Sequence, residues 1–392
     1  MPINYQQIKK QIPHFCELAA EHNQVIHSTA QRLLYTLNQY SDQVGQLIGL
    51  VETESASNKS LRCAKPTDEA LASVHGLPEL DTVATLIAAD GSQINPSRHR
   101  QVDFCLINVA TISLQTGMDV APVINTESIL LDIGELTPDN APLTEDILAL
   151  ERDIRERAAL AHQASKYTPP MVTMTDGPLE LFRETSNTAR FEKKLAEYIG
   201  ILSDLSKSRT ITVGYVDKPQ SDLVNRLIKL IIKNESQTPA QAMRELERIW
   251  VSDANLFSEL LSSPGDRSAI YCIQSPWSKL FKEELALYFF YLNVSRSETP
   301  YLARIEIPAW CTRDPETLNQ LHAAIYRQCD IMGPRPYPYI LHRAHEIAVV
   351  TYEETLELDA MIAVELKRRG IDAGSISNKQ SAKDLPSRGR YQ

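Results

Sequence analysis

Two segments of the chain run from an apolar stretch into an aspartate that is followed at once by glycine: Asp90 after residues 84–89, and Asp176 after residues 171–175. Such stretches predict buried strands, and the glycine lets the chain turn or lets a ligand approach the backbone. Both carboxylates are therefore expected at strand ends. If those ends are neighbours, the like charges repel unless a proton or a cation lies between them. Divalent cations prefer oxygen ligands, so the pair predicts a metal site, whereas each segment alone also fits an ordinary turn.

A third acidic ligand is available on a helix predicted between these two segments. Residues 151–157 alternate acids with arginines, a pattern typical of a solvated, salt-bridged helix face. The alternative is that one acid points back toward the strand ends as a third ligand. Glu156 is the first choice, because the small side chains of Ala158 and Ala159 let that face lie close to the sheet. Glu151 is the reserve candidate.

A tyrosine and a histidine are bracketed by rigid backbone near the C-terminal end of the chain. Prolines on both sides of Tyr337 hold it in an extended stretch before a helix, and His345 lies within that helix. An imidazole can ligate a metal or exchange a proton near neutral pH, and a tyrosine hydroxyl can hold a phosphate or an attacking water. Lys218 ends another predicted strand, where its ammonium could pair with a phosphate. The alternative at each position is an ordinary surface or core residue.

The elements that must position these residues follow one another in a recognisable order. The predicted order is three adjacent strands, then a helix, a strand, a helix and a strand. This order predicts an α/β layer with a mixed sheet, which matches the ribonuclease H-like architecture. The chain has neither G-x-G-x-x-G nor G-x-x-x-x-G-K-[ST], so a dinucleotide-binding or P-loop fold lacks its phosphate cradle. The elements are expected over residues 83–90, 103–114, 121–132, 144–165, 171–176, 187–207 and 210–216.

The chain divides into three regions by pattern. Apolar residues at helical spacing predict amphipathic helices over residues 3–53, and the looser stretch 54–78 fits a linker. We therefore expect an N-terminal helical segment with its linker over residues 1–78 and the α/β domain over residues 79–372. The tail, residues 373–392, has almost no large apolar side chain and is expected to be disordered.

Composition limits the classes of function. The formal net charge of −10 counts against nonspecific DNA binding, although an enzyme that acts on phosphates can confine its basic residues to a local patch and neutralise its carboxylates with cations. The six cysteines include no C-x-x-C pair, so neither a zinc ribbon nor a dithiol redox motif is expected. The polar N-terminus and the absence of a bilayer-length apolar stretch predict a cytoplasmic protein without a membrane span.

Four motifs occur in an order that resembles the NurA nuclease family, from about residue 84 to residue 351. They are Asp-Gly-Ser after the first strand, an Arg-Glu pair on the helix, Asp-Gly-Pro-Leu after a later strand, and Tyr-Pro-x-x-Leu-x-x-Ala-His near the end. The resemblance implies that Asp90, Glu156 and Asp176 are acidic metal ligands. It further implies that His345 is a ligand or proton carrier and that Tyr337 is a catalytic-site residue.

The lysine of the family is matched only loosely. Lys218 stands at the expected strand end, but Asp217 and Pro219 flank it where small or hydroxyl residues are expected. Residues 98–100, two arginines and a histidine just after the first aspartate loop, are further candidates for phosphate contacts.

The resemblance also implies cofactors and partners. Members of the family have a ribonuclease H-like fold, use manganese, and degrade DNA as 5′ to 3′ exonucleases and single-strand endonucleases. They form dimers that dock on the hexameric HerA translocase in the resection of double-strand breaks. A Mn²⁺-dependent nuclease that acts on single-stranded DNA and duplex ends is therefore expected, with a HerA-type ATPase and a second copy as partners. Mg²⁺ is the alternative ion, but a mixed oxygen and imidazole ligand set suits Mn²⁺ better.

Two other functions fit parts of the pattern. The same fold could serve as a non-catalytic dimeric adaptor of the motor, in which the acids bind a structural ion or turn the chain. A phosphotransferase of the actin and sugar-kinase type shares the sheet layout and an early aspartate, but the chain lacks clear glycine-rich phosphate loops. Cleavage polarity, the number of metal ions and the role of the N-terminal helices stay open.

Overall fold

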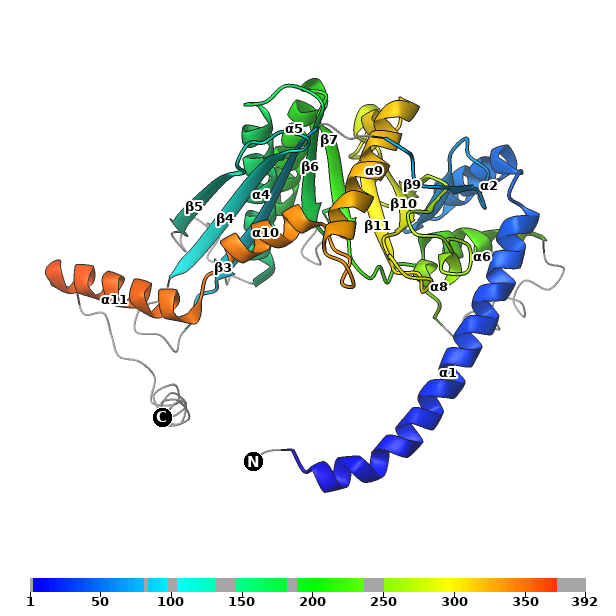
Figure 1. The fold of residues 1–392 in the computed structure, drawn as a ribbon, viewed down its shortest axis with the longest axis horizontal. Helices are drawn as coiled ribbons and strands as arrows, with labels where there is room; N and C mark the ends of the chain where they lie inside the picture. The colour runs from blue at the N-terminus through cyan, green and yellow to red at the C-terminus, as the bar shows by residue number, and fades with distance from the viewer. Residues whose placement is uncertain are drawn as a thin grey trace. The chain divides into compact units, whose positions relative to one another are not determined.

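The structure of the chain, a computed structural model, is drawn in Figure 1. Its residues group by proximity into two units. The first unit comprises Met1–Thr82, Asp176–Glu180 and Ile211–Tyr339, and the second comprises Val83–Thr175, Leu181–Thr210 and Ile340–Gln392. The structure describes residues 3–80, 84–97, 104–131, 145–181, 189–235 and 250–371.

A mixed sheet forms the centre of the second unit. Strands β3 (Thr85–Ile94), β4 (Cys105–Gln115) and β5 (Val123–Leu131) form an antiparallel meander. Strand β6 (Met171–Asp176) pairs with β3 in parallel, and its last register pair joins Thr175 to Ala89. The order in the sheet is β6-β3-β4-β5.

Alternate residues along a strand point to opposite faces of the sheet, so both faces of this sheet carry side chains that need cover. Helices supply that cover on both faces. Helix α4 (Glu145–Ala164), which packs against α5 (Ala189–Lys207), lies on the face that carries Cys105, Ile107 and Val109 (Figure 1). Helix α10 (Tyr339–Ala348) lies on the opposite face, followed by α11 (Tyr352–Arg368), whose apolar residues pack on that face against Ile94 and Leu106.

The elements follow one another along the chain as β3, β4, β5, α4, β6, α5 and β7 (Ile211–Val216). This order confirms the predicted ribonuclease H-like α/β fold with its mixed sheet and flanking helices. The N-terminal helical segment is also present, as α1 (Tyr5–Gln39) and α2 (Val44–Ser57).

Two local predictions from the sequence are wrong. Strand β3 does not end at Asp90 but continues through Gly91 to Ile94, because its pairing with β4 extends to Leu106. The stretch 54–78, predicted as a linker, contributes β1 (Cys63–Pro66) and β2 (Val74–His75), and its Leu71 is fully buried.

Some predicted features lie outside the described residues. They are the phosphate-contact candidates 98–100 and the tail 373–392.

The first unit contains an antiparallel set of strands in the order β1-β9-β10-β11-β7, with β2 paired to β8 and β8 to β10. Stacked aromatic rings fill its core, and the ring centroids of Phe257 and Tyr291 lie 4.9 Å apart. The remaining elements are β7 (Ile211–Val216), α6 (Leu223–Glu235), α8 (Asp253–Phe257), β8 (Arg267–Ser268), β9 (Tyr271–Gln274), η1 (Glu283–Leu285), β10 (Leu287–Asn293), β11 (Leu302–Pro308), η2 (Ala309–Cys311) and α9 (Pro315–Ile331).

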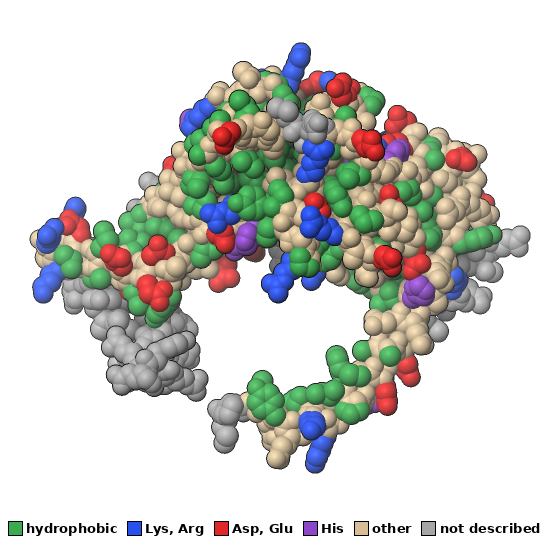
Figure 2. Space-filling model, in the orientation of Figure 1, with side chains coloured by type: hydrophobic (Ala, Val, Ile, Leu, Met, Phe, Trp, Pro, Cys, Tyr) green, Lys and Arg blue, Asp and Glu red, His purple; other side chains and the backbone are tan. Residues whose placement is uncertain are grey.

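Helix α1 is anchored only near its C-terminal end. Its buried side chains are Ala30, Leu33 and Leu37. Earlier along the helix, apolar side chains such as Ile12 (49% exposed) and Phe15 (70% exposed) face solvent, and Figure 2 shows this apolar stripe along the helix. Over the part of the chain that the structure describes, no helix combines the length and apolarity that a membrane span requires.

A buried histidine of the first unit makes stability depend on pH. His322 Nε2 lies 2.6 Å from the carbonyl oxygen of Gly265 and donates to it, and burial lowers the pKa of His322 from 6.5 to about 4. The folded state therefore resists protonation, whereas the unfolded chain takes up a proton below pH 6.5. The contribution of neutral His322 to the unfolding free energy is therefore fully present above pH 6.5 and is lost as the pH falls toward 4.

We expect the unfolding free energy of the natural chain to fall between pH 7 and pH 5 by about 2 kcal/mol more than that of a His322→Gln variant. Urea unfolding at the two pH values measures the difference. Burial raises the pKa of Asp253 to about 6, so this group makes the unfolding free energy rise as the pH falls toward 5. Both proteins contain Asp253, and its effect therefore cancels in the comparison. Equal pH dependence in the two proteins would contradict the assignment.

Candidate active site

An aspartate of the sheet and a histidine of α10 meet in the second unit. His345 Nδ1 lies 2.7 Å from Asp90 Oδ2, and the two side chains are 64% and 19% exposed. Carboxylate contact at one ring nitrogen orients an imidazole and fixes which nitrogen carries the proton. The other nitrogen, Nε2, remains available to a ligand or to solvent.

Hydrogen bonds from the sheet hold α10 in the position that makes this contact. The carbonyl oxygen of Ala348, at the end of α10, accepts hydrogen bonds from Ser92 Oγ (2.5 Å) and Asn108 Nδ2 (2.9 Å). Ser128 Oγ donates to Asn108 Oδ1 over 2.7 Å, so β3, β4 and β5 all contribute. Helix C-termini leave carbonyls without intrahelical partners, and here two side chains satisfy one of them. The serine of the Asp-Gly-Ser motif therefore positions the helix that carries His345.

Glu156 reaches β3 from the opposite face, at the glycine that follows Asp90. A Cβ atom at Gly91 would lie 2.6 Å from Glu156 Oε1 and 2.8 Å from Arg152 Cγ, so only glycine leaves room for these two side chains. Gly91 therefore permits a close helix approach rather than a turn.

Glu156 is 5% exposed. Burial raises the pKa of Glu156 to about 8, and the charge on Asp153 acts in the same direction, whereas Arg157 and Arg152 oppose the rise. This acid therefore holds its charge only with positive charge beside it.

Arg152 supplies positive charge between the acids. Its Nε lies 3.1 Å from Glu156 Oε1, and its Nη2 lies 3.1 Å from Asp153 Oδ1. Interaction with the charge of Asp90 also helps to raise the pKa of Arg152 against the effect of burial. Arg152 and Asp153 were not among the predicted site residues, although the i to i+4 spacing of Arg152 and Glu156 was a signal for the pair.

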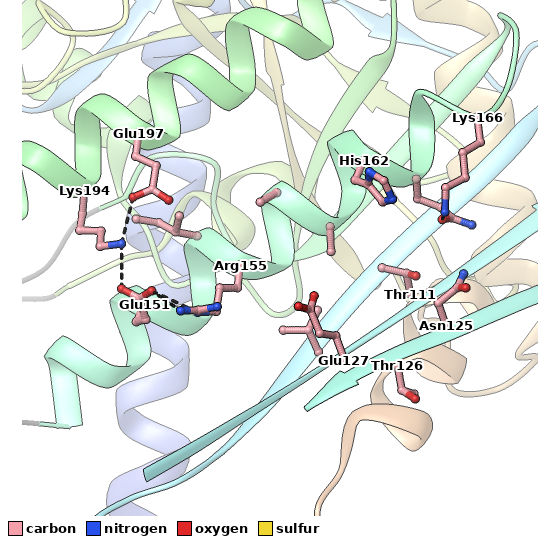
Figure 3. Close-up of a pocket in the computed structure, with 15 residues that line it drawn as sticks. Thr111, Asn125, Thr126, Glu127, Glu151, Arg155, His162, Lys166, Lys194 and Glu197 are labelled. Atoms are coloured by element: carbon pink, nitrogen blue, oxygen red, sulfur yellow. Dashed lines mark hydrogen bonds and ion pairs between the residues drawn. The ribbon is translucent and has the colours of Figure 1, made fainter. Parts of the chain in front are cut away.

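Glu151, the reserve candidate, lies elsewhere. It lies five positions before Glu156, which places the two side chains about 140° apart around the helix. Its carboxylate binds Arg155 Nη2 (3.0 Å) and Lys194 Nζ (2.9 Å) at the edge of a polar pocket of about 550 Å³ between α4, α5 and the sheet (Figure 3).

The second aspartate, Asp176, belongs to the first unit and is exposed. The chain turns directly after it, since Gly177 has a φ of +88° and its N–H donates to the carbonyl of Tyr215 over 2.7 Å. A Cβ at Gly214 would lie 2.8 Å from the carbonyl oxygen of Gly177. Both glycines are therefore required by the turn that carries Asp176.

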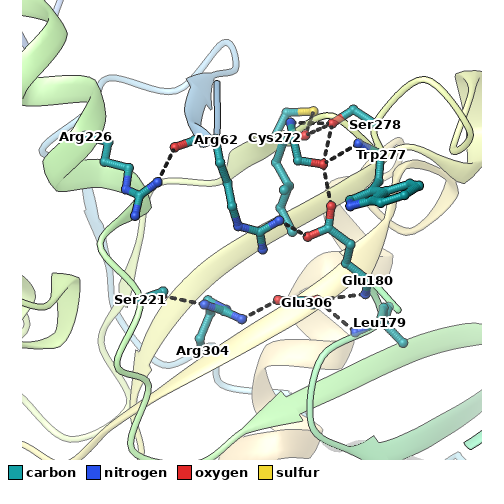
Figure 4. A network of polar contacts seen from close by, with 12 residues as sticks. Arg62, Leu179, Glu180, Ser221, Arg226, Cys272, Trp277, Ser278, Arg304 and Glu306 are labelled. Atoms are coloured by element: carbon teal, nitrogen blue, oxygen red, sulfur yellow. Dashed lines mark hydrogen bonds and ion pairs between the residues drawn. The ribbon is translucent and has the colours of Figure 1, made fainter. Parts of the chain in front are cut away.

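A buried ion pair fixes the residues that follow this turn. Glu306, fully buried, accepts the N–H of Leu179 at Oε2 over 2.8 Å, and its Oε1 lies 2.6 Å from Arg304 Nη2 (Figure 4). Glu180, next along the chain, pairs with Arg62 and accepts from Ser275 Oγ. The last residue of the Asp-Gly-Pro-Leu motif is thus fixed by a side chain 127 residues away in sequence.

Lys218 and Tyr337 also lie in the first unit. Lys218 has a φ of +43°, an unusual backbone conformation for a residue with a side chain, and its Nζ lies 5.8 Å from the ring centroid of Tyr301. The ring of Tyr337 packs edge-on against Tyr215, with centroids 5.4 Å apart.

The structure therefore divides the six predicted site residues. Asp90, Glu156 and His345 gather in the second unit, and Asp176, Lys218 and Tyr337 belong to the first. Among the described residues, no three His, Cys, Asp or Glu side chains approach closely enough to form a ready metal cluster. The donor chemistry nevertheless fits a divalent cation, because carboxylate oxygens and an imidazole are suitable ligands and the buried acid Glu156 needs positive charge beside it.

Comparison with known proteins gives a family match. The family model described as the NurA domain matches residues 84–350. No curated protein matches the chain in sequence.

Several solved structures are similar to the chain. The crystal structure of the NurA nuclease from Sulfolobus solfataricus is 10% identical, covers 91% of this chain and 98% of that chain, and has a TM-score of 0.48. The catalytic domain of human endonuclease V is 15% identical, covers 77% and 94%, and has a TM-score of 0.32. A Ciona intestinalis endonuclease V in complex with DNA is 14% identical, covers 79% and 96%, and has a TM-score of 0.30.

Proposed function

We propose that this chain, which belongs to the NurA family, is a metal-dependent nuclease that hydrolyses phosphodiester bonds of DNA. The observation that carries the proposal is the arrangement around β3. There Asp90 contacts His345 from a helix near the end of the chain, and Glu156 approaches the same strand at Gly91. Residues far apart in sequence that match the motifs of the family thus gather at one strand.

We propose Asp90, Glu156, Asp176 and His345 as the residues that would hold the metal, with Mn²⁺ as the ion and Mg²⁺ as the alternative. Ala89 and Thr175 form the last register pair between β3 and β6. Asp90 directly follows the first of them in the chain and Asp176 directly follows the second, which supports a role for both. Glu156 is preferred to Glu151 because the carboxylate of Glu151 is already bound by two cations.

A bound divalent cation would neutralise charge on the phosphate and lower the pKa of a bound water. The residues of the chain supply the rest of the chemistry. With Nδ1 held by Asp90, His345 offers Nε2 either as a ligand to the metal or, as the alternative role, for proton exchange in general acid or base catalysis. Arg152 favours the charged form of Glu156 and so opposes the effect of burial on the pKa of that acid. We propose that Lys218 pairs with the phosphate and that the hydroxyl of Tyr337 holds the phosphate or the attacking water.

Cleavage of end-labelled DNA tests the function. We expect the purified chain to cut single-stranded DNA and duplex ends in Mn²⁺, to cut more slowly in Mg²⁺, and to lose activity when EDTA removes the metal, with activity returning when Mn²⁺ is restored. Labels on the 5′ and 3′ ends distinguish the proposed 5′ to 3′ direction from the reverse. Failure to cut any form of DNA with either ion would overturn the proposal.

A non-catalytic adaptor is the second candidate, and one observation favours it. The carboxylate of Glu156 pairs with Arg152 on its own helix and lies against β3 at Gly91, an arrangement that also suits an acid whose role is to hold α4 on the sheet. Tight association with a HerA-type ATPase, together with a lack of metal-dependent cleavage, would support the adaptor.

We also propose that the protein forms a homodimer and works with a HerA-type hexameric ATPase in the resection of double-strand breaks. The family membership motivates both partners, and the exposed apolar stripe of α1 (Ile8, Ile12 and Phe15) supports self-association. Sedimentation equilibrium of the chain alone tests the dimer, since a monomeric mass at micromolar concentration would contradict it. Co-sedimentation with the ATPase tests the second partner.

A further inference from the structure

A groove of about 490 Å³ lies in the first unit, beside two of the proposed site residues. One wall is the connection between β10 and β11, and the other is the segment after α9 that leads into Tyr337. Both walls present ring surfaces, and the connection adds hydroxyls. The lining residues are Ser295, Arg296, Ser297, Thr299, Pro300, Tyr301, Gly333, Pro334 and Pro336.

Hydrogen bonds fix the connection between the strands. Asn293 Oδ1 accepts the N–H groups of Ser295 (3.1 Å) and Tyr301 (3.2 Å), and the N–H of Val294 donates to the carbonyl of Tyr301 over 2.9 Å. The connection is therefore closed on itself by a fully buried asparagine.

An ion pair joins the two walls. Arg296 Nη2 lies 2.7 Å from Oδ2 of Asp330, near the end of α9, and Gly333, with a φ of +64°, redirects the chain after that helix. Prolines at positions 334 and 336 limit the backbone of the second wall further. The groove is thus pre-formed, as binding sites for small organic groups commonly are.

The groove adjoins Lys218 and Tyr337. The ring of Tyr301, which lines the groove, has the ammonium group of Lys218 5.8 Å from its centroid. Pro336, on the opposite wall, directly precedes Tyr337 in the chain. Arg335 is exposed between the two prolines of that wall. Cations therefore stand beside both walls. The lining residues include no Asp or Glu, and the nearby carboxylate of Asp217 accepts a hydrogen bond from the hydroxyl of Tyr301 over 2.9 Å.

We propose that this groove binds one nucleoside of the DNA strand next to the phosphate that is cleaved. The base would lie against the rings of Tyr301 and the prolines, and the neighbouring phosphates would contact Lys218 and Arg335. Contact between a base and a ring surface tolerates any sequence, and cations beside the groove suit the phosphate backbone. This inference rests on the proposed nuclease function, and it assigns a substrate subsite that prefers an unpaired base.

Binding of a fluorescein-labelled oligothymidylate tests the subsite. Fluorescence anisotropy in EDTA gives the affinity without cleavage, and steady-state cleavage in Mn²⁺ gives KM and kcat. We expect Tyr301→Ala to weaken binding and raise KM roughly 5- to 150-fold with little change in kcat. Tyr301→Phe keeps the ring and should stay within about twofold.

The matched control is Tyr288→Ala, which removes a part-exposed tyrosine from a different pocket of the same unit. Circular dichroism checks that all variants fold. Unchanged affinity and KM in Tyr301→Ala, with a natural chain that binds and cuts DNA, would overturn the subsite alone. A natural chain that neither binds nor cuts DNA would overturn the nuclease function and the subsite together.

Discussion

Asp90→Asn is expected to lower the rate of manganese-dependent DNA cleavage by on the order of 10³-fold. Asparagine keeps the size of the side chain but removes the negative charge that would bind a cation and polarise His345. The unfolding free energy should change by less than about 1 kcal/mol, because the site is part-exposed and asparagine can still accept a hydrogen bond from the imidazole. Single-turnover cleavage and urea unfolding measure the two effects separately.

The remaining acids provide the controls for this prediction. Asp176→Asn should reduce cleavage to a similar extent, and both variants should bind Mn²⁺ more weakly in calorimetric titrations. Glu151→Gln removes an acid from the same helix as Glu156, but that acid is bound to Arg155 and Lys194, so the cleavage rate should stay within about threefold of the natural chain. Full activity in both aspartate variants would contradict the proposed metal site.

Local sequence pattern predicted the elements that carry the acids. Strand β6 was predicted over residues 171–176, as observed, because a β-branched apolar run ends at a glycine that turns the chain. The helix with Glu156 was predicted within a residue of its observed ends, since its apolar residues follow helical spacing.

The same local pattern failed at Gly91, where Asp-Gly reads as a turn. The glycine instead makes room for Glu156 and Arg152, and only the packed fold reveals that contact. Segment 54–78 reads as a linker because it is polar and rich in breakers, yet β1 pairs there with β9, a strand about two hundred residues later. Partners at such separations leave no periodic signal in the sequence, and for that reason the structural roles of Ser92, Asn108 and Glu306 were not predicted.

Glu306→Ala is expected to lower the unfolding free energy by about 3–5 kcal/mol, because it leaves Arg304 buried without its partner. It also removes the acceptor for the N–H of Leu179, three residues after Asp176. Small displacements of a catalytic group can reduce a rate by up to about 10²-fold, so cleavage should fall at least tenfold in the fraction that remains folded. Urea unfolding and single-turnover cleavage at low temperature measure both.

Two further variants separate stability from positioning. Replacing the pair with apolar residues, Arg304→Met with Glu306→Leu, should recover most of the lost stability but not the cleavage rate, because Leu179 still lacks its acceptor. Glu69→Ala breaks another ion pair of the same unit, in which Glu69 binds Arg267 and accepts the N–H of Ile270 over 2.9 Å. The Glu69→Ala variant should lose about as much unfolding free energy as Glu306→Ala, but its folded fraction should cleave DNA at the rate of the natural chain. If the apolar pair cleaves DNA as fast as the natural chain, Glu306 contributes only to folding and does not position Asp176.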